Sequence, residues 1–166
     1  MKTANMVLLG VLLSGHLALG QDRAKSASNE PTAEHGRYLI QITGCNDCHT
    51  PMYAPKNGAV PEKDWLSGSD VGWKGPWGTS YPTNLRARVA GMTEDQWVTY
   101  LKHLKSLPPM PYYSVNAMAE KDARSIYRFI RSLGNHSQSI PSSLPPGKIP
   151  QTPYVNFDVI PPQAKK

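Results

Sequence analysis

Apolar side chains recur at helical spacing in three separate stretches of the chain. The first covers residues 33–44, and the second begins at Thr93, where Thr93 to Gln96 form a capping box. The third covers residues 120–133 and stops before Gly134, a residue that favours helix termination. The pattern predicts three helices, whose inward positions are Gly36, Leu39, Ile40 and Thr43, then Trp97, Leu101 and Leu104, then Ala123, Ile126, Tyr127, Ile130 and Leu133.

The absence of a side chain at Gly36 suggests a close crossing of the first and last predicted helices. The third helix offers Tyr127 as the residue that Gly36 would approach. After Gly134 the pattern ends, and residues 135–166 contain seven prolines with no helical spacing. This Pro-rich extension is either disordered or a belt that holds on to the body through Tyr154, Val155 and Phe157.

The first twenty residues have the pattern of a secretory signal peptide. Lys2 precedes an apolar stretch from Met6 to Leu19, and small residues lead up to a cleavage site after Gly20. The apolar stretch is shorter than the roughly 20 residues needed to cross a bilayer. We therefore expect a signal peptide at 1–20, a linker at 21–32, one domain at 33–134 and the extension at 135–166. The expected location is the periplasm, with no transmembrane segment after cleavage.

The formal net charge of +6 is moderate and is not concentrated in runs. Nucleic-acid binders usually gather basic residues into a stripe, whereas here they alternate with acids on the helical patterns. No nucleic-acid partner is expected. The basic excess instead indicates a docking surface for an acidic protein or a solvated face that maintains solubility.

The two cysteines of the chain carry its most specific signal. Cys45 and Cys48 stand two residues apart, and His49 follows at once, which makes a C-x-x-C-H motif. At this spacing each thiol can add across one vinyl group on a haem edge, and the histidine then lies beneath the iron. A neutral imidazole binds metal through one nitrogen while the other donates to a carbonyl. We expect one covalently attached haem c, held by Cys45 and Cys48, with His49 as an iron ligand.

Two other sites use cysteines at this spacing. A thioredoxin-like site requires an α/β pattern with buried strands, and no such run of Val and Ile is present. A zinc site requires further ligands, but the remaining histidines beyond residue 20, His35, His103 and His136, are isolated. Haem attachment is favoured over both.

An electron carrier also needs a sixth iron ligand, and a thioether raises the reduction potential relative to a second histidine. Met110 lies in Leu107–Pro111, where three prolines impose an extended backbone that can hold a sulfur opposite His49. A methionine more often fills a core gap, but such a role does not require the flanking prolines. The rivals are Met118, near the start of the last helix, and His103, which the helical pattern directs away from the apolar face.

These features together resemble the small class I c-type cytochromes over residues 33–134. Four segments of the chain are similar to segments of the haem domains that serve as cytochrome subunits of bacterial periplasmic dehydrogenases, including those oxidising alcohols and aldehydes. These segments are G-R-Y-L, G-C-N-D-C-H-T-P, T-N-L and P-P-M-P-Y-Y. The resemblance implies His49 and Met110 as the axial ligands. The segment Asn84–Arg88 departs from the N-I-T-P-D found in many of these domains.

The expected fold is all-α, with three to four helices around one haem in the cytochrome c manner. More than forty residues between the motif and the second helix lack periodicity, which is unusual for a compact domain. A haem would explain them, because a loop can bury Trp65, Trp73 and Trp77 against its flat apolar edge. Candidate partners for the haem propionates are the Trp nitrogens, Tyr81, Asn84, Arg86 and Arg88.

The function predicted from the sequence is that of a periplasmic monohaem cytochrome, an electron-transfer protein and not itself an enzyme. It would accept single electrons from a dehydrogenase and pass them to a cytochrome or an oxidase. One alternative is a cytochrome subunit bound permanently to a dehydrogenase, with the Pro-rich extension in the contact. Another is a haem sensor or peroxidase-like protein, which needs an open sixth coordination site.

Overall fold

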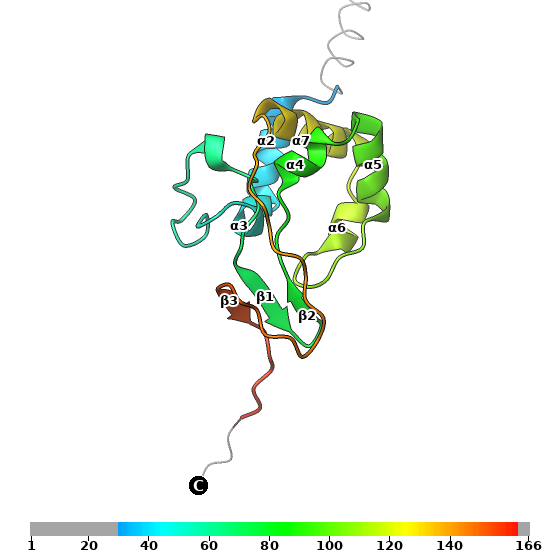
Figure 1. Ribbon diagram of the computed structural model, residues 1–166. Coiled ribbons are helices and arrows are strands. Elements are labelled where there is room, and N and C mark those ends of the chain that lie inside the picture. Colours follow the sequence, from blue (N-terminus) through cyan, green and yellow to red (C-terminus); the bar gives the residue numbers. More distant parts are fainter. Residues whose placement is uncertain (1–29, 163–166) are drawn as a thin grey trace, which may run out of the picture. The chain divides into compact units, whose positions relative to one another are not determined.

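A computed structural model describes residues 30–162, so the expected signal peptide and most of the linker lie outside the described residues. All described elements belong to the unit of residues 31–166, which is helix-rich with a small sheet (Figure 1). The elements are α2 (Ala33–Ile42), α3 (Cys45–His49), the 3-10 helix η1 (Glu62–Asp64), β1 (Gly72–Gly75), β2 (Gly78–Ser80), α4 (Leu85–Ala90), α5 (Glu94–His103), α6 (Tyr112–Asn116), α7 (Glu120–Ser132) and β3 (Tyr154–Asn156).

The crossing of α2 and α7 forms the centre of the helical part. A Cβ atom on Gly36 would lie only 2.0 Å from the backbone oxygen of Ser125. The expected close approach at Gly36 is therefore confirmed, but its partner is Ser125 and not Tyr127. The two helices are also joined by the backbone N–H of Thr32, which donates to the Ser125 hydroxyl at 3.2 Å.

Helix α5 begins as its sequence predicts and packs against α7. Thr93 and Gln96 form the capping box, with both reciprocal hydrogen bonds present. Trp97 is buried, and its indole N–H donates to the Ala123 carbonyl of α7 at 3.1 Å. The core joins these three helices to the loops through Leu39, Ile40, Trp65, Leu66, Val89, Trp97, Val98, Leu101, Ala123, Ile126, Phe129 and Ile130.

A three-stranded sheet departs from the all-α expectation. Strands β1 and β2 form an antiparallel hairpin within the long loop, and β3 from the Pro-rich extension pairs parallel to β1. The sheet lies below α3 and α4 in Figure 1, and the chain after α7 runs down past α4 to reach it. The pairing joins residues more than seventy positions apart, so hydrophobic periodicity does not indicate it. The extension therefore forms a belt over residues 136–158.

Residues 136–152 of this belt are held to the body at several points. An isolated bridge joins Leu144 to Thr79, with hydrogen bonds of 2.9 and 2.8 Å in the two directions. The Tyr81 hydroxyl contacts the Thr152 hydroxyl at 3.1 Å.

Across residues 30–162, no helix combines the length and the hydropathy that crossing a membrane requires.

Candidate functional site

Helix α3 carries the whole C-x-x-C-H motif in little more than one turn. Cys48 and His49 follow Cys45 by three and four positions, so both lie on the same face of the helix as Cys45. Asn46 and Thr50 face the core instead. The Thr50 hydroxyl donates to the Asn46 side chain at 2.7 Å and accepts from the Leu66 backbone N–H at 2.8 Å. These bonds fix the orientation of α3 and hence the face that carries the motif.

His49 is held by two backbone contacts from the loop that follows the motif. Its Nδ1 lies 2.8 Å from the Thr83 carbonyl oxygen, so this nitrogen carries the proton as the donor. The His49 carbonyl accepts from the Gly68 N–H at 2.8 Å. Burial lowers the pKa of the imidazole, and the Thr83 contact only partly opposes this shift. A neutral ring with Nδ1 engaged leaves Nε2 as the nitrogen suited to bind a metal.

The two cysteines are free thiols in an environment that keeps them protonated. Burial is the main cause that raises the pKa of Cys45, and burial followed by the charge of Asp47 raises that of Cys48. A thiol-disulfide oxidoreductase lowers the pKa of its attacking cysteine, so this environment argues against that alternative. Within residues 30–162 no group of three or more His, Cys, Asp or Glu is arranged to hold a metal ion.

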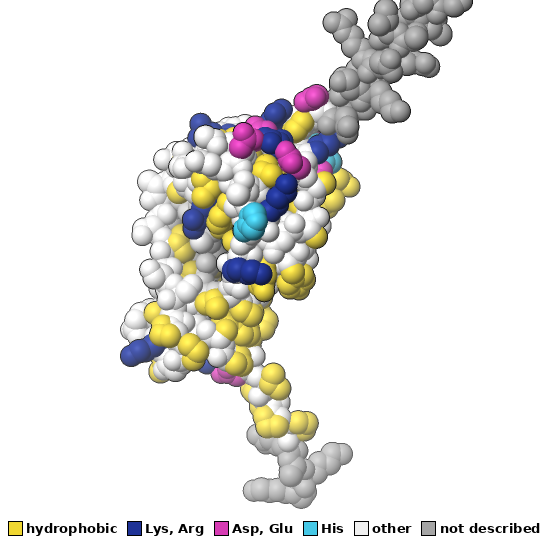
Figure 2. Space-filling model, turned by 90° about the vertical axis from the view of Figure 1, so that its right-hand side faces the viewer, with side chains coloured by type: hydrophobic (Ala, Val, Ile, Leu, Met, Phe, Trp, Pro, Cys, Tyr) yellow, Lys and Arg dark blue, Asp and Glu magenta, His cyan; other side chains and the backbone are white. Residues whose placement is uncertain are grey.

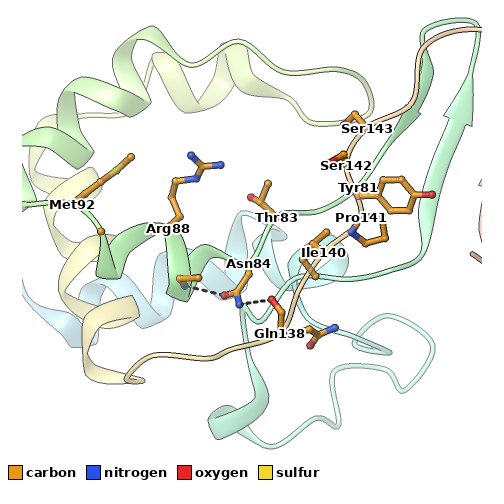
Figure 3. A pocket seen from close by; sticks show the side chains of 12 residues that line it. Tyr81, Thr83, Asn84, Arg88, Met92, Gln138, Ile140, Pro141, Ser142 and Ser143 are labelled. Atoms are coloured by element: carbon orange, nitrogen blue, oxygen red, sulfur yellow. Dashed lines mark hydrogen bonds between the residues drawn. The ribbon is translucent and has the colours of Figure 1, made fainter.

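A cleft of about 630 Å³ opens beside the Thr83 and Asn84 backbone (Figure 3). One wall comes from α4 and the residues after it, including Arg88 and Met92, and the other from residues 138–143 of the belt. The Arg88 guanidinium lies over the Tyr100 ring, 5.3 Å from its centroid. Figure 3 shows the side chains of Arg88 and Met92 extending on the same side of α4.

The methionines beyond the signal segment differ in their surroundings. Met52 is exposed on its loop, and Met92 and Met118 pack against the hydrophobic core. Met110 is half-buried and is not among the residues packed on that core. Its loop is tied to the hairpin, because the Ser80 hydroxyl donates to the Pro108 carbonyl at 2.6 Å.

Most of the side chains proposed for the propionates are already bound within the protein. Arg86 is buried and donates to the carbonyl oxygens of Leu133, Gly134 and Asn135, which directly follow α7, and to that of Lys63, so its donors are used within the protein. Asn84 caps α4 and also binds the belt. Among the side chains named, Arg88 lines the cleft and has no carboxylate partner in the described chain. The other engaged groups are Trp65 with Val60, Trp77 with Trp73, and Tyr81 with Thr152.

The remaining histidines of the described chain are engaged elsewhere. His103 is exposed on α5 with its Nδ1 at 2.9 Å from the Thr99 carbonyl, as an exposed helical histidine should be. His35 pairs with Asp122 at 2.8 Å, and His136 Nδ1 accepts from the Gln138 N–H. Sequence reasoning missed Thr83, because it acts through its backbone oxygen. The T-N-L segment that contains it was the available signal.

Comparison with known proteins gives one match. The chain is 26% identical over 115 residues, 63% of its length, to the fructose dehydrogenase cytochrome subunit of Gluconobacter japonicus. It spans about a fifth of the length of that curated relative, 22%. No family model matches, and no solved structure matches. At this identity, the likeness gives weak support for a cytochrome c-like protein and for an electron-transfer role.

Proposed function

We propose that this chain is a c-type cytochrome in which Cys45 and Cys48 attach one haem c and His49 binds its iron. The observation that carries the proposal is the geometry of α3: two free thiols and a buried, neutral histidine share one face, and the histidine Nδ1 is engaged by a fixed carbonyl. That donor set fits haem c. A structural zinc site needs four ligands, and among residues 30–162 no group of three or more His, Cys, Asp or Glu is arranged to hold a metal ion, so the site fits zinc poorly.

Met110 is the proposed sixth ligand. It is half-buried in a loop fixed by prolines and by the Ser80 contact, whereas Met92 and Met118 contribute to the core. Arg88 is the proposed propionate partner, since it lines the cleft and its guanidinium forms no ion pair within residues 30–162. The haem, when bound, supplies one-electron chemistry, and the protein sets its potential through ligand type, burial and hydrogen bonds.

Of the two functions considered for such a cytochrome, a subunit bound permanently to a dehydrogenase is favoured over a freely diffusing electron carrier. The matched relative is by its name a cytochrome subunit of a dehydrogenase. In addition, the Pro-rich extension exposes large apolar side chains: Ile149 at 69%, Val159 at 91% and Ile160 at 80%. On the face of the molecule in Figure 2, apolar side chains are frequent in the lower part, whereas most charged side chains lie in the upper part. An exposed apolar surface suits a lasting protein contact better than a transient, salt-sensitive one. A periplasmic location belongs to the same proposal.

The test of haem attachment and ligation is a visible spectrum of protein produced in cells able to attach haem. We expect covalent haem, a sulfur-to-iron absorption band in the oxidised protein and no rapid binding of carbon monoxide on reduction. Met110→Ala should abolish the band and lower the potential, while Met92→Ala, the matched control from the cleft, should retain it. A colourless protein would refute the proposal, rapid carbon monoxide binding would indicate a sensor, and loss of the band in Met92→Ala alone would reassign the ligand.

The test of the subunit reading is purification of the untagged protein at high salt from its own cells. A flavin, molybdenum or quinone dehydrogenase that remains bound supports an apolar, permanent contact. Release of a single free cytochrome under conditions that preserve dehydrogenase activity would support the shuttle instead.

A further inference from the structure

The two backbone groups that hold His49 belong to segments without long regular structure. Thr83 lies between β2 and α4, and Gly68 lies between η1 and β1. The two segments are joined by the Ser69 N–H, which donates to the Pro82 carbonyl at 3.1 Å, and by the Leu66 carbonyl, which accepts from the Leu85 N–H at 3.1 Å. The belt adds a second set of contacts to both segments.

Residues 136–140 of the belt contact both segments. The Asn84 side-chain amide donates to the carbonyls of His136 and Gln138, at 2.8 and 3.2 Å. Ile140 packs against Gly68 so closely that a Cβ on this glycine would lie 2.7 Å from the Ile140 Cδ1. The belt thus supports both contacts that His49 makes with the loop.

Asn84 connects these parts through the two ends of one side chain. Its Oδ1 accepts from the Ala87 N–H at 3.0 Å and caps α4, while its Nδ2 donates to the belt. Figure 3 shows the amide between α4 and the belt segment that carries Gln138 and Ile140. Because Asn84 directly follows Thr83, a shift of Asn84 moves the carbonyl that orients the His49 ring.

We propose that Asn84 is a positioning residue through which the C-terminal belt fixes the Thr83 carbonyl and so tunes His49 as an iron ligand. The inference rests on the proposed function. A firm hydrogen bond from Nδ1 to a carbonyl makes the imidazole a stronger base, and a more basic ligand favours the oxidised iron. Loosening the belt at Asn84 therefore shifts the midpoint potential to more positive values.

The test compares neutral variants of the full-length, haem-loaded protein. Asn84→Ser keeps an efficient helix cap but is too short to reach the belt, and it adds no charge that would itself move the potential. We expect a positive shift in midpoint potential and altered His49 ring signals in the proton NMR spectrum, with the sulfur-to-iron band retained. Tyr81→Phe is the control, because it removes a belt contact at Thr152 without touching Asn84.

Two results would overturn the proposal: unchanged potential and ring signals in Asn84→Ser, or an equal shift in Tyr81→Phe, which would indicate general loosening. If Asn84→Ser does not fold, Asn84→Thr provides the second neutral variant, because its hydroxyl can also cap α4 and is likewise too short to reach the belt. A positive shift in Asn84→Thr supports the role of Asn84, and an unchanged potential overturns it. Failure of the proposed function itself is distinguishable, because the unmodified protein would then lack the covalent haem or the sulfur-to-iron band.

Discussion

Substitution of Gly36 by alanine should destabilise the protein although it places a better helix former in α2. Alanine gains up to about 1 kcal/mol over glycine in a helix interior. The new Cβ, however, would lie 2.0 Å from the Ser125 carbonyl oxygen and 2.4 Å from its carbon, where ordinary contact begins at 3.4 Å. The obstructing atoms are backbone and cannot rotate away.

The two helices must then separate by about 1.4 Å, which also loosens the packing of Leu39, Ile40 and Ile126 between them. Overpacking of a core costs about 1–3 kcal/mol and occasionally more. A backbone clash of this size belongs at the upper end. After the gain in helix propensity, we expect a net loss of about 2 kcal/mol in the free energy of unfolding.

Urea unfolding followed by circular dichroism measures this loss. Gly91→Ala is the matched control, because Gly91 ends α4 with φ of −91° and the nearest atom to its added Cβ is 3.7 Å away. The control should change stability by less than about 0.5 kcal/mol. A Gly36→Ala protein as stable as the unmodified one would show that α2 and α7 are not in the close contact described.

Three further predictions concern links between distant parts of the chain. Arg86→Met removes the donors to the carbonyls of Leu133, Gly134 and Asn135, which directly follow α7, and should lower the free energy of unfolding by about 3 kcal/mol; a loss below about 1 kcal/mol in urea unfolding would contradict the capping role. Lys74 pairs with Asp158 at 2.7 Å and lowers the pKa of the Asp158 carboxyl below its usual 3.8. The ion pair therefore stabilises the belt at pH values above 3.8, and this stabilisation is lost as the pH falls through the lowered pKa. Amide exchange in β3 should rise as the pH falls through the lowered pKa, and Lys74→Gln should remove this pH dependence. Ser80→Ala frees the Met110 loop and should weaken the sulfur-to-iron band without affecting covalent haem attachment.

The sequence predicted α2, α5 and α7 because local patterns determine them, whereas the short helices α4 and α6 were not predicted. The capping box at Thr93 and the spacing of Ala123, Ile126 and Ile130 depend on residues within one or two turns. The C-x-x-C-H motif was equally readable, since its chemistry depends on five consecutive residues. Haem attachment itself stays a prediction.

The sheet and the support of His49 were not predictable in the same way. Strand β3 is three exposed residues that pair with β1 across more than seventy positions, and no periodicity identifies such a pairing. Thr83 acts through a carbonyl that every residue possesses. Arg86 shows the converse, since its charge suggested a ligand contact whereas its position beneath the end of α7 makes it a helix cap.

The hairpin that the sequence did not indicate is the element common to both sides of the proposed iron site. Ser80, at the end of β2, binds the loop that carries Met110, and three residues later the Thr83 carbonyl binds His49. One short backbone segment therefore connects to both proposed axial ligands, and the belt holds that segment at Thr79 and at Asn84.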